Sequence, residues 1–261
     1  MLLRRPWPRA LPQGLLISAM ALSVGCRHKP TTAVAPPPPA IAPTTPTTTP
    51  VTPPAPPPSP SSPATVADSP ADADFVSTHP VVYTEEGLAS WYGPPYDKRR
   101  GANGEIFDKD ALTAAHRTLP MNSLIRVTNL STGQAAILRV TDRGPFVHDR
   151  MLDLSLASAK AIGVWRPGVA RVRVEVFATP SPLDTGGRWC VQVGAFKSEK
   201  GAFKLRDQLT RKYHTANVIE FTGPTGHWVR IRPQGDDKKR AVEIARDLEP
   251  SEGEAYLVRL D

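Results

Sequence analysis

Three side chains in the middle of the chain are of types that can move protons: Glu105, His116 and Asp142. Asp142 ends a β-rich run, and it shares the parity of the apolar residues of 136–140, so a strand would place its carboxylate on their face. Such a carboxylate is either paired in the core or set at the strand end, facing a cleft. In a cleft, burial would raise its pKa and make it a usable proton donor. On spacing alone, pairing with Arg143 or capping of nearby amides is the simpler interpretation.

The other two candidates are each open to a structural interpretation as well. Glu105 follows Asn103-Gly104, a turn signal, so it lies in a loop, where it could serve only to cap the next segment. His116 lies on or near an apolar strand, where a histidine is often a core residue with satisfied hydrogen bonds. Asp153 is expected to be structural, capping a helix over 155–163. No set of His, Cys, Asp and Glu has metal-ligand spacing, so neither a metal nor another cofactor is expected.

These residues belong to an ordered series of motifs between Gly87 and Phe177. The series reads GLASWYG, GANGEIFD, LTAAHRTLP, RVTNLSTGQ, RVTDRGPF and LDLS. Ser131-Thr132-Gly133 predicts a hairpin turn between the β-rich run of RVTNLSTGQ and the one that leads to RVTDRGPF. The order of motifs resembles the rare lipoprotein A family, which implies a double-psi β-barrel over residues 81–178.

The resemblance also implies an activity for the barrel. In that family the positions matching Glu105, His116 and Asp142 line the cleft and are tied to glycan cleavage. The active members are lytic transglycosylases, which break the β-1,4 bond between N-acetylmuramic acid and N-acetylglucosamine without water and leave a 1,6-anhydro end. Asp142 would protonate the glycosidic oxygen and then draw the proton from the C6 hydroxyl. Glu105 would stabilise charge or orient the substrate, and His116 would hydrogen-bond to the sugar or to a carboxylate.

Two other functions remain open at this point. One is a non-catalytic wall binder, similar to the expansins, whose related barrel loosens polysaccharide without breaking bonds. The other is a glycoside hydrolase in which Glu105 and Asp142 act as an acid/base pair with water. Trp91 and Tyr92, in the expected opening strand, either stack on sugar rings or belong to the core.

The N-terminal residues 1–25 are typical of a secretory signal. Three arginines precede the apolar run Leu15–Val24, which is too short for a stable transmembrane helix. The small residue before Cys26 resembles a lipoprotein signal, with Ser23 standing where leucine is usual, and implies that Cys26 is lipidated. Simple secretion, with Cys26 an incidental thiol, is the alternative. By the same resemblance, the residue after the cysteine implies the outer membrane as destination.

Residues 26–80 are expected to form a disordered tether. Between Pro30 and Pro80 lie 17 of the 30 prolines of the chain, interleaved with Thr, Ala and Ser and with no Lys or Arg. Such a composition cannot bury a core and stays extended. Roughly 50 residues at about 3.1 Å each would reach on the order of 150 Å, enough for a lipid-anchored domain to reach the cell wall.

A second module is expected over 188–261, after a linker at 179–187. Its hydrophobic pattern predicts the order β-α-β-β-α-β, a four-stranded antiparallel sheet with two helices on one face. The complete fold class is therefore mainly β followed by α+β. The segment VQVGAF and the order of elements resemble a SPOR domain, a family that binds peptidoglycan stripped of its stem peptides.

The resemblance implies that glycan binds the open face of this sheet. Alternation directs Gln192 to the face opposite its valine neighbours, and Trp228, Arg230 and Tyr256 are the other expected contacts. Aromatic stacking and arginine attraction to the lactyl carboxylate of muramic acid suit that ligand. The alternative for Trp228 is packing under a helix. Nucleic acid is not an expected partner, because the module lacks the aromatic signature of RNA-binding sheets and follows an export signal.

The sequence as a whole predicts an outer-membrane lipoprotein of a Gram-negative bacterium, facing the periplasm. It would cleave peptide-free glycan, endolytically or exolytically, and be concentrated at the division septum by its SPOR domain, with division-site proteins as possible partners.

Overall fold

The computed structural model describes residues 65–93, 96–223, 226–250 and 253–261. All of these residues belong to one unit. The expected signal segment, Cys26 and most of the expected tether lie outside the described residues. Within the described ranges, none of the helices combines the length and the apolar composition needed to cross a membrane.

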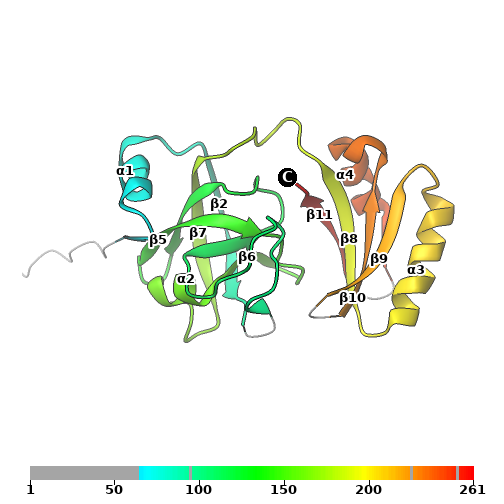
Figure 1. Cartoon of the computed structure of the whole chain (residues 1–261), viewed down its shortest axis with the longest axis horizontal. Coiled ribbons are helices and arrows are strands. Elements are labelled where there is room, and N and C mark those ends of the chain that lie inside the picture. The colour runs from blue at the N-terminus through cyan, green and yellow to red at the C-terminus, as the bar shows by residue number, and fades with distance from the viewer. Residues whose placement is uncertain (1–64, 94–95, 224–225, 251–252) are drawn as a thin grey trace, which may run out of the picture. The chain divides into compact units, whose positions relative to one another are not determined.

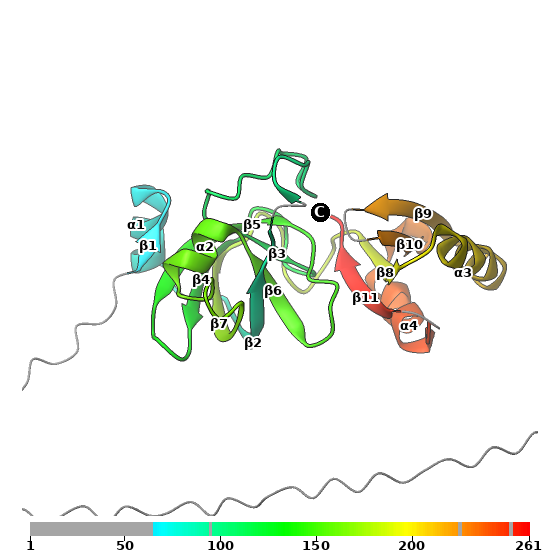
Figure 2. The ribbon, with the colours of Figure 1, turned by 90° about the horizontal axis from the view of Figure 1, so that it is seen from below.

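Six strands close into a barrel, which confirms the expected fold of the first module (Figures 1 and 2). The strands are β2 (Tyr83–Trp91), β3 (Thr113–His116), β4 (Leu124–Asn129), β5 (Ala135–Asp142), β6 (Arg150–Leu154) and β7 (Val169–Ala178). Their order is β5-β3-β6-β2-β7-β4, and β4 pairs back with β5. The pairs β2–β6 and β3–β5 are parallel, and the remaining pairs are antiparallel. β3 pairs in parallel with β5 and antiparallel with β6, which brings the ends of β5 and β6 to either side of β3.

The barrel core follows from the alternation of these strands. On β5, Ala136, Leu138 and Val140 are buried in the main hydrophobic cluster, as the sequence predicts. The predicted hairpin between β4 and β5 is also present. Gly133 has a φ of 72°, a backbone conformation that favours glycine, and its N–H donates to the carbonyl of Asn129 at 2.8 Å.

The helix after β6 is shorter than predicted and has a different cap. Helix α2 covers Leu156–Ala161, and the hydroxyl of Ser155 accepts from the N–H of Ser158. Asp153, expected to cap this helix, instead lies within β6. The expectation was wrong because a serine directly before the helix already supplies the oxygen that the first-turn amides need.

The tether ends earlier than its composition suggests. Strand β1 (Val66–Ala67) pairs in parallel with β5, and helix α1 (Pro70–Thr78) follows it. Ser69 caps α1, and proline stands in its first turn, where a missing N–H costs nothing. Val76 of α1 is buried in a small cluster with β4, β5 and β7 residues. The proline-rich composition concealed a capped helix with enough apolar side chains to pack on the barrel.

The second module has all six predicted elements. They are β8 (Trp189–Phe196), α3 (Glu199–Lys212), β9 (Asn217–Gly223), β10 (Gly226–Arg232), α4 (Lys238–Asp247) and β11 (Glu254–Arg259), with a 3-10 turn, η2 (Gln234–Asp236), before α4. The strand order is β11-β8-β10-β9, antiparallel throughout. Helices α3 and α4 lie on the same face of this sheet (Figure 1). The α+β arrangement is therefore as predicted.

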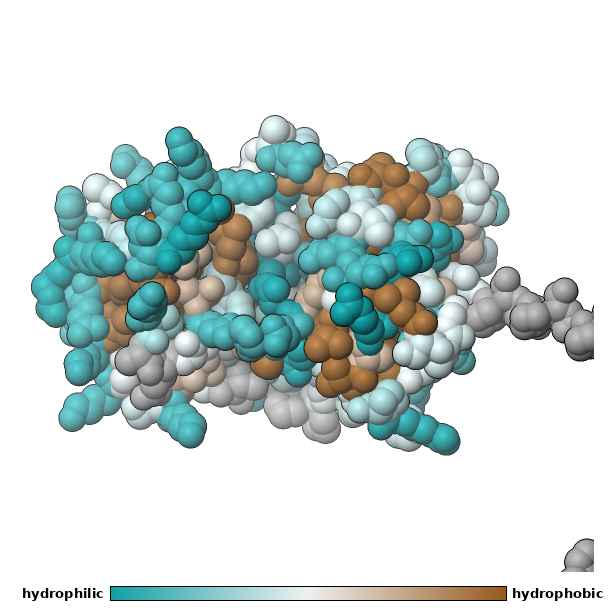
Figure 3. Space-filling view, turned by 180° about the vertical axis from the view of Figure 1, so that it is seen from behind, coloured by the Kyte–Doolittle hydropathy of each residue, from teal (hydrophilic) through white to brown (hydrophobic). Residues whose placement is uncertain are grey.

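The surface carries scattered apolar residues. On the face shown in Figure 3, hydrophobic residues form separate patches among hydrophilic ones. The large exposed apolar side chains of the described ranges come from different elements and loops, for example Val82, Ile106 and Trp165. Single exposed apolar residues of this kind are ordinary on globular proteins and indicate no particular partner.

Candidate active site

A cavity of about 710 Å³ opens where β5 and β6 end. Its lining includes the carboxylates of Asp142 and Asp153, the ring of Tyr92 and, from the second module, Gln192 and Trp228. Ligand sites in proteins usually enclose about 300–1,000 Å³, so the cavity has the size of one that holds a small molecule or a short polymer segment.

Asp142, the last residue of β5, faces this cavity. Its Oδ1 accepts two backbone N–H bonds, from Ala102 at 2.9 Å and from Arg143 at 2.8 Å. The guanidinium of Arg143 points elsewhere and donates to the carbonyls of His116, Leu119 and Asp261. Burial raises the pKa of Asp142 despite the two amides. The group therefore suits proton donation: the protonated form is favoured by burial, and the ionised form is held by amides once the proton has left.

Asp153 is a second carboxylate in the same cavity, and sequence reasoning missed it. The hydroxyl of Ser90 on β2 donates to its Oδ1 at 2.6 Å, and Arg150 lies 3.4 Å from its Oδ2. Burial raises the pKa of Asp153 as well, and its charge contributes to raising that of Asp142. The available signal was alternation, because Asp153 separates two fully buried leucines of β6 and must face the other way.

Glu105 belongs to the loop whose Ala102 contacts Asp142, but its carboxylate is outside the cavity lining. The residue is exposed, and its Oε2 accepts from the amide of Asn103 at 2.8 Å. Its backbone carbonyl accepts from the N–H of Gly101 at 2.8 Å, which closes the loop whose Ala102 amide binds Asp142. The structure thus places the Glu105 loop, rather than the Glu105 carboxylate, against the candidate acid.

His116 is buried and has a network of its own. Its Nδ1 accepts from the N–H groups of Thr118 at 3.2 Å and Leu119 at 3.0 Å, so the proton of the neutral ring is on Nε2. Nε2 faces the Glu85 carboxylate at 3.3 Å. Burial lowers the pKa of His116, while Glu85 opposes that shift. The ring is not part of the cavity lining, and its contacts hold the turn that follows β3.

Aromatic rings form one side of the cavity. Tyr92 and Phe107 have ring centroids 4.5 Å apart, and Tyr96 packs edge-on to Tyr92 at 5.6 Å. Trp91, by contrast, packs against the main barrel core. Of the two aromatic residues that the sequence left open, Tyr92 therefore faces the cavity. Rings of this kind offer flat apolar faces that suit the faces of sugar rings.

The expected glycan contacts of the second module lie on the sheet face opposite α3 and α4. Gln192 and Trp228 are absent from the helix-side core, and Trp228 is therefore not packed under a helix. The Nη2 of Arg230 donates to Oε1 of Gln192 at 2.7 Å. Phe146, in the loop after β5, packs edge-on to Trp228 at 5.2 Å and to Tyr256 at 5.7 Å. Gln192 and Trp228 are only 3% and 6% exposed, although the sequence suggests an open face.

Comparison with known families separates the same two modules. Residues 84–174 match the family described as lytic transglycolase, and residues 185–259 match the SPOR domain. Three relatives, each named "Endolytic peptidoglycan transglycosylase RlpA", come from Campylobacter jejuni, Vibrio cholerae and Pseudomonas aeruginosa. They are 38%, 36% and 53% identical over 166, 166 and 168 residues, which are 54%, 61% and 64% of this chain.

The chain is similar to rare lipoprotein A proteins, and its C-terminal residues match the SPOR domain. The matched region spans 59%, 63% and 49% of the three relatives, less than two thirds of each. The closed barrel and the sheet with helices on one face are the two folds that the family leads one to expect.

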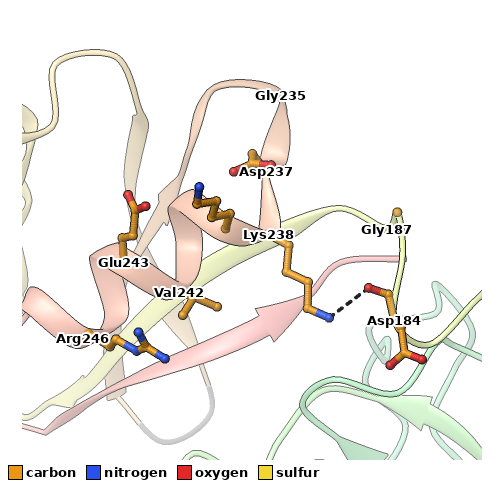
Figure 4. A pocket seen from close by; sticks show the side chains of 10 residues that line it. Asp184, Gly187, Gly235, Asp237, Lys238, Val242, Glu243 and Arg246 are labelled. Atoms are coloured by element: carbon orange, nitrogen blue, oxygen red, sulfur yellow. Dashed lines mark hydrogen bonds between the residues drawn. The ribbon is translucent and has the colours of Figure 1, made fainter.

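A second hollow lies beside α4, in the SPOR domain (Figure 4). It measures about 590 Å³, and the ammonium of Lys238 reaches the carbonyl of Asp184 across it at 3.4 Å. Most of the residues around it are exposed, and its charged side chains are solvated. It has no aromatic lining and no buried carboxylate, so the chemistry is assigned to the Asp142 cavity.

Proposed function

We propose that this chain is a lytic transglycosylase that cleaves the bond between N-acetylmuramic acid and N-acetylglucosamine in peptidoglycan. The observation that carries the proposal is Asp142, a carboxylate whose pKa burial raises and which lines a cavity of about 710 Å³. The names of the three relatives support the same reaction class.

The proposed reaction needs one carboxyl group that first donates a proton and later accepts one. Protonated Asp142 gives its proton to the glycosidic oxygen as the bond from that oxygen to C1 breaks. The C6 hydroxyl of the same muramic acid then bonds to C1 and returns its proton to the carboxylate. No water is consumed, and the product is a 1,6-anhydro end. The N–H groups of Ala102 and Arg143 stabilise the ionised carboxylate between the two steps.

The proposal extends to substrate and place. The substrate is peptide-free glycan, cut endolytically or exolytically, and the SPOR domain concentrates the enzyme on such glycan at the division septum. Lipidation of Cys26 anchors the chain in the outer membrane, with the proline-rich segment as its tether. Its motif pattern supports export and anchoring.

The decisive experiment is mass spectrometry of products released from amidase-treated sacculi. Anhydro ends are expected from the wild type and should disappear with Asp142→Asn, whose side chain keeps an oxygen for both amides. Turnover that survives in this variant refutes the assignment of Asp142. Products without anhydro ends, or no products at all from a folded protein, refute the proposed reaction.

A glycoside hydrolase is the second candidate, and one observation favours it. Asp142 and Asp153 share a single cavity and their charges interact, as in a pair that acts as acid and base around a water. Glu105 is the weaker partner for that role, since its carboxylate is outside the lining. Reducing ends instead of anhydro ends in the same experiment would select this candidate.

A further inference from the structure

We propose that Arg143 is a positioning residue for Asp142, on which it acts by fixing the backbone of the loop after β5. Its guanidinium holds that loop, residues 143–146, against the turn after β3, residues 116–119. The inference rests on the proposed function and adds to it a residue that need not touch the sugar. It concerns how the acid is held in place in the cavity.

The end of β5 is not held by regular strand pairing. The register between β3 and β5 shifts between Ala114 and Ala115, so that Asp142 pairs after an irregular step. Two residues further on, Gly144 has a φ of 147°, a backbone conformation that favours glycine. Because glycine restricts the backbone least, the loop needs other contacts to fix its shape.

The Arg143 side chain supplies the first of these contacts. Its Nη1 donates to the carbonyls of His116 at 3.0 Å and Leu119 at 2.6 Å, and its Nη2 donates to that of Asp261 at 2.6 Å. The backbone N–H of the same residue donates to Oδ1 of Asp142 at 2.8 Å. Arg143 therefore binds the turn with its side chain and the acid with its main chain, and the position of one depends on the other.

Arg117 supplies the second contact, in the opposite direction. It belongs to the turn after β3, and its Nη1 donates to the carbonyl of Pro145 at 2.9 Å and to that of Arg150 at 2.7 Å. The turn and the loop are thus joined by one arginine from each side. Gly144 lies between the two points of attachment, so its backbone freedom is restrained by its neighbours.

The surroundings of Arg143 favour a functional role over a purely stabilising one. Its acceptors are neutral carbonyls, and its Nε is buried without a hydrogen-bond partner among the described residues. Burial lowers the pKa of the guanidinium to about 10, so the group stays charged at neutral pH. A buried charge with an unsatisfied donor costs free energy. Stability alone does not explain such a residue next to the acid.

Arg143 also influences when Asp142 carries its proton. Burial raises the pKa of Asp142, whereas the amides of Arg143 and Ala102 and the charge of Arg143 oppose that shift. The other charged or titratable groups of the same cavity are Asp153 on β6, Tyr92 after β2, Arg99, Arg100, Arg150 and Arg230. Removal of Arg143 takes away two of the opposing influences, so the pKa of Asp142 should rise.

The kinetic test compares Arg143→Gln and Arg143→Lys on peptide-free glycan fragments, with anhydro ends counted by mass spectrometry. Arg143→Gln should lower kcat roughly 10- to 100-fold, the size expected for a misplacement of about 1 Å, and should change KM less. Protonated Asp142 is the active form, so the rate falls as pH rises through its pKa, and this fall should move to higher pH. Arg143→Lys keeps the charge and one donor group, so it should recover part of both effects.

Arg126→Gln is the matched control. The Arg126 guanidinium also makes two hydrogen bonds, to Glu175 of β7 at 2.8 and 3.0 Å, but it lies outside the cavity lining. Any loss of stability in this variant should leave kcat and the pH dependence of the folded protein unchanged. The inference is wrong if folded Arg143→Gln keeps both at wild-type values, or if Arg126→Gln changes them to the same extent.

An NMR arm needs no turnover and therefore separates this inference from the proposed function. The amides of Ala102 and residue 143 both bind Asp142, so in wild type the resonances of both should follow its titration. In Arg143→Gln, only Ala102 should follow it, at a higher pKa. An amide at position 143 that still follows the titration fully overturns the inference, whereas a wild type that releases no anhydro ends rejects only the proposed function.

A second variant is available if the Arg143 variants do not fold. Arg117→Lys weakens the attachment of Pro145 from the other side of the same contact and leaves the Arg143 side chain intact. It should lower kcat and weaken the response of the amide of Arg143 to the titration of Asp142. Wild-type values of both in this variant would equally overturn the inference.

Discussion

His116 is the residue for which the family resemblance and the structure assign different roles. The resemblance implies a contact with the sugar or with a carboxylate, whereas the structure gives the ring a structural role as acceptor for backbone amides. Its Nδ1 accepts two N–H bonds, from Thr118 and from the buried Leu119 amide, and its Nε2 faces Glu85. His116→Ala removes the acceptor and leaves both amides without this partner. A buried donor that loses its acceptor costs about 1–3 kcal/mol, so the two together cost roughly 2–6 kcal/mol. That is a large share of the roughly 5–15 kcal/mol by which domains are stable.

Two replacements distinguish the ring nitrogens. The Oδ1 of asparagine lies near the position of Nδ1, so His116→Asn should recover most of the unfolding free energy. Glutamine places its amide near Nε2, so His116→Gln should recover little. Urea unfolding gives the free energies, and anhydro-end release per folded molecule gives the activity. His214→Ala, at an exposed position, is the matched control and should change neither.

The pH dependence follows from the same contacts. Burial lowers the pKa of His116 in the folded state below that of the unfolded chain, so folding favours the neutral ring. The stabilisation from the neutral His116 ring is complete above the pKa of histidine in the unfolded chain, about 6.5. It is lost as pH falls toward the lower pKa of His116 in the folded state. Wild type should therefore lose more stability than His116→Asn between about pH 7 and pH 5. A His116→Ala protein as stable as wild type but inactive would refute the structural role and return His116 to the chemistry.

Three further outcomes are expected. Asp142→Asn should be at least as stable as wild type at neutral pH, because burial disfavours the charge that it removes. Asp142→Ala should lower the unfolding free energy by about 1–3 kcal/mol, because two amides lose their acceptor; urea unfolding that finds Asp142→Ala the more stable variant contradicts this. Gly194→Ala should cost about 1–3 kcal/mol by overpacking Trp228, while Gly168→Ala, also at positive φ but in open space, should cost less in thermal unfolding. Burial raises the pKa of the Cys190 thiol to about 11, so iodoacetamide should label it only in denaturant; rapid native labelling would contradict its burial.

The helices and strands of the second module could all be predicted, because the sequence pattern that specifies each one lies within that element. Each strand has an apolar alternation, each helix an apolar face, and serine or aspartate caps precede both α3 and α4. The end of the tether was less accessible. Proline density is a property of composition, and it hid the capped helix α1, whose stability comes from packing on β4, β5 and β7.

The site was only partly predictable for a related reason. Strand parity left Asp142 open between amide capping and a place in a cleft, and the family resemblance favoured the cleft. The structure shows both the two amide bonds and the place in the cavity. Asp153 was missed because its partners, Ser90 and Asp142, lie 63 and 11 residues away in the sequence. The exposure of Gln192 and Trp228 was misjudged because Phe146, which covers Trp228, belongs to the other module. Alternation assigns a residue to a face, but it does not say what lies against that face.

The pairing of β3 with both β5 and β6 explains why two acids with raised pKa values occur together. β3 lies between β5 and β6 and pairs with both, so residues at the ends of those strands are neighbours regardless of their separation in sequence. In register, Ala115 of β3 is paired with Asp142 on one side and Asp153 on the other. A small residue at that position leaves space above it, and Ala115 itself lines the cavity. A larger side chain at 115 would therefore fill the space between the acids, so Ala115→Leu in the otherwise wild-type chain should abolish glycan binding without removing either carboxylate.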